Sequence, residues 1–440
     1  MKTGDFRGIL KEMKGCEPLK KYLITTVLLV LVIAGVVGTI LLRSGEGPTA
    51  TAPEEYCPQP CAHSYWEAGT CRDCGVNCIH RQWVDGMCIR CGYCCDHETW
   101  LPNQCARCGM ACPHEEYNTE NHSCAHCGVE LSHLYDGYLC RVCSQPLELE
   151  DDTLPWEIFY HIPEAGTVEK LSYEAPDYYA LSLGEPSAVT YSKDVCVYLP
   201  YNYDPTRQYD VLVLLHGMGG NEEYWLLAEQ DYHRAKDEYL VRTKELLDNM
   251  IAQQLCNEVI VVTPTFYRDT NNLFDYNRRQ DQLRFSKELQ EIILPLIVET
   301  YSTYAADSSR ESISAARQHF AFAGLSMGSI YGYNAVLPES LDLFAWYGLF
   351  SGSECDNLYH LASVLNAPEN LQYPISFFYN SAGTRDVMGE LHYEQYRELL
   401  GLYPNLVDGK NATFTYIKGA FHEYRAWCTG LYNFLRIAFH

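Results

Sequence analysis

The spacing of short apolar runs in the last two-thirds of this 440-residue chain constrains its fold most. Runs of four or five apolar residues end in turns, and longer amphipathic stretches separate them; they are Val211–Leu215, Val259–Thr263, Phe320–Ala323, Ile375–Tyr379 and Thr413–Ile417. Strands that are buried on both faces of a parallel sheet have this pattern. We therefore expect an α/β fold whose mostly parallel sheet carries helices on both faces.

Polar residues with catalytic potential follow three of these runs. Ser326 comes directly after an apolar strand and lies between Gly324 and Gly328, in the pattern of a nucleophile elbow. Asp386 follows the fourth run and His422 follows the fifth. A serine hydroxyl needs an imidazole to accept its proton, and the imidazole needs a carboxylate to orient it. The order serine, aspartate, histidine is that of the α/β-hydrolases, so these residues are predicted to be catalytic.

An oxyanion in such a site needs two backbone N–H donors. We assign one to Met327, next after the serine, and the other to Met218 in the glycine-rich turn after Leu215. His216 is expected to shape this turn rather than to take part in the chemistry. Asp356 and Glu390 remain alternative candidates for the acid. No cofactor is expected for catalysis.

Five segments resemble one family of enzymes. These segments, residues 166–182, 197–222, 247–267, 288–305 and 320–332, are similar to the carbohydrate esterases of the esterase D, feruloyl esterase and acetyl xylan esterase type. The resemblance covers roughly residues 155–440 and implies an α/β-hydrolase fold. It also implies that Ser326 is the nucleophile, Asp386 the acid and His422 the base. The text around the histidine, GAFHEYRAW, and the turn HGMGG depart from the common family pattern, which affects the substrate rather than the reaction.

An apolar stretch near the N-terminus has the length of a membrane span. Residues 22–42 contain no charged side chain, and six basic residues precede them within the tail 1–21. This asymmetry predicts a single-pass helix with a cytoplasmic N-terminus and all later residues outside the cell membrane. A cleaved signal peptide is the alternative. Residues 43–56, rich in glycine, proline, alanine and threonine, are expected to form a linker.

Residues 57–143 contain a repeat with a period of 17 residues and hold 16 of the 21 cysteines. Each unit has the order C-x-H, an aromatic residue and C-x-x-C, and in most units a glycine follows. The fourth unit is longer by two residues, and in the fifth Leu131 replaces the first cysteine. These units resemble zinc-ribbon-like repeats of exported proteins from anaerobic Gram-positive bacteria.

Zinc is the preferred interpretation of the repeats because a Cys₃His set completes a tetrahedral site, whereas disulfides do not need a histidine in register. Disulfides remain the alternative, since exported cysteines usually oxidise. Each C-x-x-C could also join the C-x-H that follows it, as in Cys71, Cys74, Cys78 and His80. Cys57 and Cys94 lie outside the register. The candidate ligands are Cys61, His63, Cys71, Cys74, Cys78, His80, Cys88, Cys91, Cys95, His97, Cys105, Cys108, Cys112, His114, Cys124, Cys127, His133, Cys140 and Cys143.

The net negative charge of the chain limits the kinds of molecule that it can bind. The chain has 57 acidic and 32 basic residues, and the repeat block has no lysine, so nucleic acid is excluded as a partner. The repeats are expected to bind protein or glycan. After a second linker, residues 144–154, we expect an esterase domain over residues 155–440 that removes feruloyl or acetyl groups from plant polysaccharide. An acyltransferase acting on cell-envelope sugars, or a surface binding protein with a degenerate hydrolase domain, are the alternatives.

Overall fold

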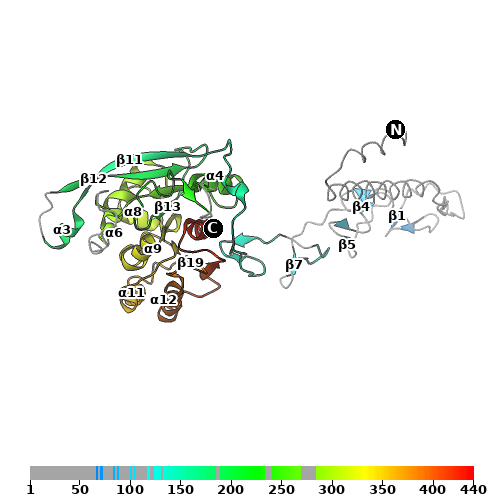
Figure 1. Ribbon diagram of the computed structural model, residues 1–440. Coiled ribbons are helices and arrows are strands. Elements are labelled where there is room, and N and C mark those ends of the chain that lie inside the picture. Colours follow the sequence, from blue (N-terminus) through cyan, green and yellow to red (C-terminus); the bar gives the residue numbers. More distant parts are fainter. Residues whose placement is uncertain are drawn as a thin grey trace, which may run out of the picture. The chain divides into compact units, whose positions relative to one another are not determined.

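A computed structural model describes residues 123–129, 132–184, 189–232, 240–268 and 284–440, together with short pieces between residues 66 and 118. The chain divides into two compact units, Met1–His114 and Glu115–His440 (Figure 1). The predicted membrane span, residues 22–42, and both flanking segments, 1–21 and 43–56, lie outside the described residues. Among the residues that are described, no helix has the length and apolar character that crossing a bilayer requires.

An eight-stranded sheet forms the centre of the second unit, in the order β11-β12-β16-β13-β17-β18-β19-β20. All neighbouring pairs from β16 to β20 are parallel, whereas β12 runs antiparallel to both β11 and β16. The strands are β11 (Thr167–Pro176), β12 (Thr190–Leu199), β13 (Asp210–Leu215), β16 (Val259–Thr263), β17 (Phe320–Leu325), β18 (Trp346–Phe350), β19 (Phe377–Gly383) and β20 (Ala412–Ile417). The predicted mostly parallel sheet is confirmed, with an antiparallel hairpin added at one edge.

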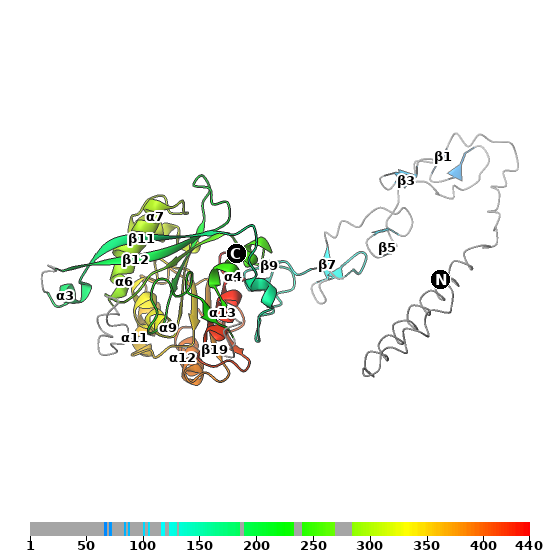
Figure 2. The same cartoon turned by 45° about the horizontal axis from the view of Figure 1, so that its top comes forward.

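That hairpin, β11 and β12, pairs over ten residues and extends beyond the rest of the sheet (Figure 2). The helix α3 (Tyr178–Ser182) lies at its tip. Asp177 caps this helix by accepting hydrogen bonds from the N–H groups of Tyr179 and Ala180.

Side chains of the central strand β13 alternate between two separate hydrophobic cores, as strand geometry requires. Val211, Val213 and Leu215 point into a core that includes residues of α7 (Leu294–Thr300), α11 (Leu358–Leu365) and α12 (Gly389–Leu402). Leu212 and Leu214 point into the opposite core, which includes residues of α4 (Thr243–Ala252) and α13 (Tyr424–Leu435). Helices therefore cover both faces of the sheet, as predicted.

The remaining elements of this unit are short. They are η1 (Trp156–Phe159), β14 (Gln230–Asp231), β15 (Leu240–Val241), α6 (Phe285–Glu288), η5 (Leu289–Ile293), α8 (Arg310–Ala315), η6 (Arg317–His319), α9 (Met327–Tyr331), η7 (Gly332–Val336) and α10 (Leu337–Glu339). The π-helical turns η5 and η7 each interrupt a longer helix. The second of these helices begins at Met327, next to Ser326, so the predicted strand–serine–helix order is confirmed.

Each of the five repeats forms a two-stranded antiparallel hairpin. The hairpins are β1 (Trp66–Glu67) with β2 (Thr70–Cys71), β3 (Trp83–Val84) with β4 (Met87–Cys88), β5 (Trp100–Leu101) with β6 (Gln104–Cys105), β7 (Tyr117–Asn118) with β8 (Ser123–Cys124), and β9 (Tyr135–Asp136) with β10 (Leu139–Cys140). In every pair the aromatic residue of the unit lies opposite the first cysteine of C-x-x-C. The repeat in the sequence is thus also a repeat in local structure.

The fifth repeat belongs to the same compact unit as the large sheet. Residues 144–154, expected to be a linker, instead pack along α13. The N–H of Glu150 donates to the side chain of Asn433, whose amide donates back to the carbonyl of Glu150. Leu154 is fully buried in the core beside α13. The folded unit therefore begins well before residue 155.

Candidate active site

Ser326 occupies a strained turn between β17 and α9. Its backbone has φ 50° and ψ −116°, a conformation that residues other than glycine rarely adopt. The two flanking glycines make this turn possible. A Cβ on Gly324 would lie 2.6 Å from the carbonyl carbon of Gly328, and one on Gly328 would lie 2.5 Å from the carbonyl oxygen of His216. The sequence pattern thus builds the sharp elbow that exposes a nucleophilic hydroxyl.

The structure brings Ser326, His422 and Asp386 into one chain of hydrogen bonds. Nε2 of His422 lies 2.9 Å from Oγ of Ser326, and Nδ1 lies 2.9 Å from Oδ1 of Asp386. An ionised carboxylate only accepts, so Nδ1 of the imidazole carries the proton, and its N–H donates a hydrogen bond to Asp386. Nε2 is then the acceptor for the serine hydroxyl. This is the tautomer that a general base at this position needs.

The environment of Asp386 keeps it ionised. Burial by itself raises the pKa of this carboxyl, but its neighbours, His422 first among them, together hold the pKa below its ordinary value. Ser351 and the backbone N–H of Met388, which donates to Oδ1 at 2.8 Å, act in the same direction. The two alternative acids, Asp356 and Glu390, are both exposed, and it is Asp386 that meets the imidazole.

The glycine-rich turn after β13 lies against the nucleophile. A Cβ on Gly217 would come within 3.1 Å of Cβ of Ser326, so the next amide, that of Met218, is close to the elbow. Neither the N–H of Met218 nor that of Met327 donates a hydrogen bond to another described residue. The assignment of these two N–H groups to an oxyanion hole stays a prediction.

His216 supports this turn from within the core, as expected. Its Nδ1 lies 2.7 Å from the carbonyl oxygen of Gly217, and its Nε2 lies 2.9 Å from Oγ1 of Thr265. Complete burial lowers the pKa of His216 to about 3, so the ring is neutral at working pH. The ring also packs on Phe266, with the centroids 4.3 Å apart.

Two functional neighbours of the triad were missed by the sequence interpretation. Ser351 follows β18 in a left-handed conformation with φ 56° and lowers the pKa of Asp386. Trp427 is the tryptophan of GAFHEYRAW, and its ring meets the ring of His422 edge-on with the centroids 5.1 Å apart. Ser351 follows the apolar run Trp346–Phe350, so a search of every strand end would have found it.

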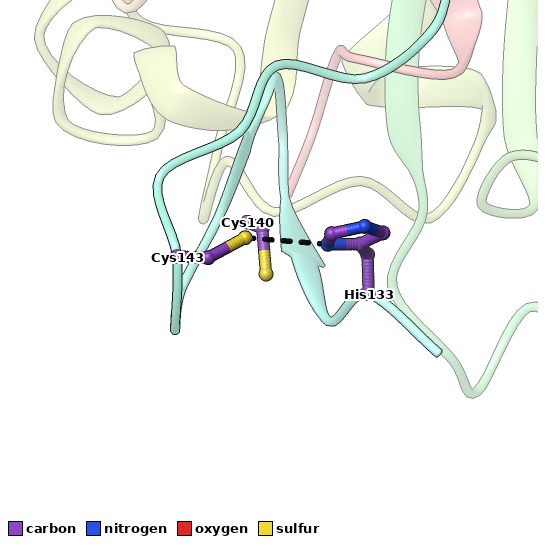
Figure 3. Close-up of side chains that lie close together, drawn as sticks. All are labelled: His133, Cys140 and Cys143. Atoms are coloured by element: carbon purple, nitrogen blue, oxygen red, sulfur yellow. Dashed lines mark hydrogen bonds between the residues drawn. The ribbon is translucent and has the colours of Figure 1, made fainter. Parts of the chain in front are cut away.

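Three of the predicted metal ligands form a cluster of their own. Donor atoms of His133, Cys140 and Cys143 all lie within 4.8 Å of one another (Figure 3). Burial raises the pKa of the Cys140 thiol, but hydrogen bonds from the N–H groups of Cys143 and Val142 and from His133 lower it to about 5. Thiolate sulfur and imidazole nitrogen are zinc ligands, so this donor set fits zinc.

The other predicted ligands are placed only in part. Cys71, Cys88, Cys105 and Cys124 lie in strands of the hairpins, and Cys127 follows β8. Eleven candidates fall outside the described residues: Cys61, His63, Cys74, Cys78, His80, Cys91, Cys95, His97, Cys108, Cys112 and His114. Cys57 and Cys94 also fall outside them.

Comparison with known proteins agrees with the fold. Residues 188–354 match the family model described as "Putative esterase". The matched segment lies within the C-terminal domain. The chain is 30% identical over 190 residues, 43% of its length, to endo-1,4-beta-xylanase Y of Acetivibrio thermocellus. The chain spans only 14% of the length of that curated relative.

Two solved structures share the fold of the C-terminal domain. The feruloyl esterase module from Clostridium thermocellum, solved with sinapinate, has a TM-score of 0.54 and 23% identity. The match covers 70% of this chain and 97% of that module. A structure of an enzyme abbreviated FAE has the same TM-score, 24% identity and the same coverage of both chains.

Proposed function

We propose that the esterase domain hydrolyses carboxylic esters through an acyl intermediate on Ser326. The observation that carries this proposal is the chain of hydrogen bonds from Ser326 through His422 to Asp386. His422 accepts the hydroxyl proton as Oγ attacks the ester carbonyl, and the buried carboxylate of Asp386 stabilises the imidazolium that forms. The N–H groups of Met218 and Met327 stabilise the oxyanion, a contribution worth about 10²–10³ in rate per donor.

His422 then gives this proton to the leaving alcohol, and the acyl intermediate on Ser326 is formed. In the second half of the reaction His422 accepts a proton from a water molecule as the water attacks the acyl carbon. The acid leaves when the tetrahedral adduct collapses and Oγ of Ser326 regains its proton. Every proton is carried by His422, and the chain's own residues complete the cycle.

The proposed substrates are feruloyl or acetyl esters on plant polysaccharide. The resemblance to a xylanase relative and to the fold of a feruloyl esterase module supports this class. Exposed apolar side chains next to the site also support it: Met218 is 53% exposed, Val387 87% and Phe421 40%. Each lies beside a residue of the site, and together they suit an apolar acyl group.

We further propose that the protein is anchored in the cell membrane through residues 22–42, with the esterase domain outside the cell. The support is the uncharged length of this stretch and the six basic residues before it. The repeats are proposed to bind zinc and, through their surfaces, protein or glycan. An outward position would give the active site access to polysaccharides that cannot enter a cell.

Hydrolysis by the full chain and its Ser326→Ala variant tests the proposal. The substrates would be p-nitrophenyl acetate, methyl ferulate and acetylated xylan. We expect kcat/KM to fall by about 10³-fold or more in the variant. Equal rates for parent and variant would refute the role of Ser326. New esters formed on an added sugar, in place of free acid, would instead identify an acyltransferase.

A further inference from the structure

The three donors of the fifth repeat converge on one point. Nδ1 of His133 lies 3.3 Å from Sγ of Cys143, and the side chain of Cys140 turns toward the same space (Figure 3). Cys140 is 2% exposed, and Cys143 takes no part in a disulfide. Donors so close together, from a hairpin and the turn that follows it, can meet a single ion.

The local backbone explains why the donors converge. Cys140 ends the hairpin, and the next turn is closed by the N–H of Ser144, which donates to the carbonyl of Cys140 at 2.9 Å. Ser144 has φ 58°, where the fourth repeat has Gly128 with φ 68° and the same bond to Cys124. The turn after the hairpin therefore has the same conformation in the fourth and fifth repeats. In the fifth repeat it places Cys140 and Cys143 beside His133 of the same unit.

The same hairpin is packed onto the esterase domain. Tyr138, at its tip, meets the ring of Phe377 with the centroids 5.0 Å apart. Gly137 lies close to the segment that follows α13, since a Cβ on this glycine would lie 3.3 Å from the carbonyl oxygen of Ile437. Phe377 is the first residue of β19, and Ile437 follows the last turn of α13. Both mark the end of the sheet opposite to Ser326.

We propose that His133, Cys140 and Cys143 bind one zinc ion, which closes the fifth repeat and thereby clamps the ends of β19 and α13 in the esterase domain. Three protein donors leave one position of a tetrahedral site for a further ligand. Because the cluster lies away from the triad, the ion acts on the stability of the domain and not on the chemical step. This inference rests on the proposed zinc binding by the repeats, and it does not depend on which ester is cleaved.

Zinc content of the full chain tests the binding. The protein would be purified under reducing conditions, and zinc measured by mass spectrometry beside protein concentration. Cys143→Ser and His133→Gln should each lower the content by one ion per chain, because other repeats cancel in the difference. Cys355→Ser, a cysteine of the esterase domain outside the cluster, should leave it unchanged. His133→Cys should retain the ion. Unchanged zinc in both of the first two variants would overturn the proposal.

Hydrogen exchange tests the clamp independently of zinc content and of activity. A chelator should raise exchange in the peptide covering residues 424–438 of the parent by at least about 10-fold, and His133→Cys should behave like the parent. In Cys143→Ser, exchange should be raised already and no longer respond. If chelation removes zinc but leaves exchange of this peptide unchanged in the parent, the ion does not clamp the domain.

Discussion

Replacing Gly383 by alanine tests how tightly the acid and base loops are held together. Gly383 ends β19, just before the turn that carries Asp386. A Cβ at this position would lie 2.2 Å from the carbonyl oxygen and 2.6 Å from the carbonyl carbon of Ala420. Ala420 precedes His422 by two residues, and its carbonyl also accepts from the N–H of Arg385. Backbone atoms cannot rotate away, so the two loops must separate.

The size of the effect follows from this geometry. Favourable carbon contacts lie near ~3.5 Å, so relief of the clash needs a shift of about 1 Å. The bond between His422 and Asp386, now 2.9 Å, would lengthen beyond hydrogen-bonding distance. A misplacement of this size costs about 10²-fold in rate. Crowding in a packed site costs about 1–3 kcal/mol of stability as well.

The assay compares Gly383→Ala with Gly401→Ala. Gly401 lies within the helix α12, and a Cβ there would meet nothing within 4 Å. Alanine in that helix should stabilise the protein by about 0.5–1 kcal/mol and leave hydrolysis unchanged. Ester hydrolysis and thermal unfolding of both variants would be measured with the parent. Full activity and an unchanged melting temperature in Gly383→Ala would refute the reasoning.

Three further predictions concern charged groups. Asp386→Asn should lower kcat by about 10⁴-fold because the imidazole would lose its tautomer, whereas Asp356→Asn should retain the activity of the parent. The lowered pKa of Asp386 contributes stability that is fully present above the ordinary carboxyl pKa of about 3.9 and is lost as pH falls through the folded pKa. The difference in melting temperature between the parent and Asp386→Asn should therefore shrink in acid. A difference that stays constant down to pH ~2 would contradict this prediction. Lys193 and Glu288 form a buried ion pair at 2.6 Å. Lys193→Ala should lower the free energy of unfolding, measured in denaturant, by about 3–5 kcal/mol because it leaves a buried carboxylate without its cation. A loss below about 1 kcal/mol would contradict this and show that the pair is hydrated.

Much of the sheet was predictable because its strands are short apolar runs bounded by turns. The five predicted runs became β13, β16, β17, β19 and β20, with ends that differ by a few residues. The strand β18 was not singled out, since Leu343 to Phe350 is one apolar stretch without a visible boundary. The antiparallel direction of β12 depends on pairing with β16, which no local pattern encodes.

The site was predictable to the extent that strand order brings residues together. The succession of Ser326, Asp386 and His422 after parallel strands was sufficient to expect their contact. The choice of Asp386 over exposed candidates depends on how the loops fold back, which is a tertiary effect. Likewise, whether residues 144–154 form a linker depends on Asn433, nearly three hundred residues away in the sequence.

The fifth repeat packs on the C-terminal domain at a fixed place relative to the nucleophile. The last repeat joins it at Phe377 and Ile437, at the edge of the sheet remote from Ser326. The fifth repeat and the nucleophile therefore lie at opposite edges of the same sheet. The edge that carries Ser326 is thus not covered by the hairpin of this repeat, and a variant that alters the hairpin can be tested without altering the triad.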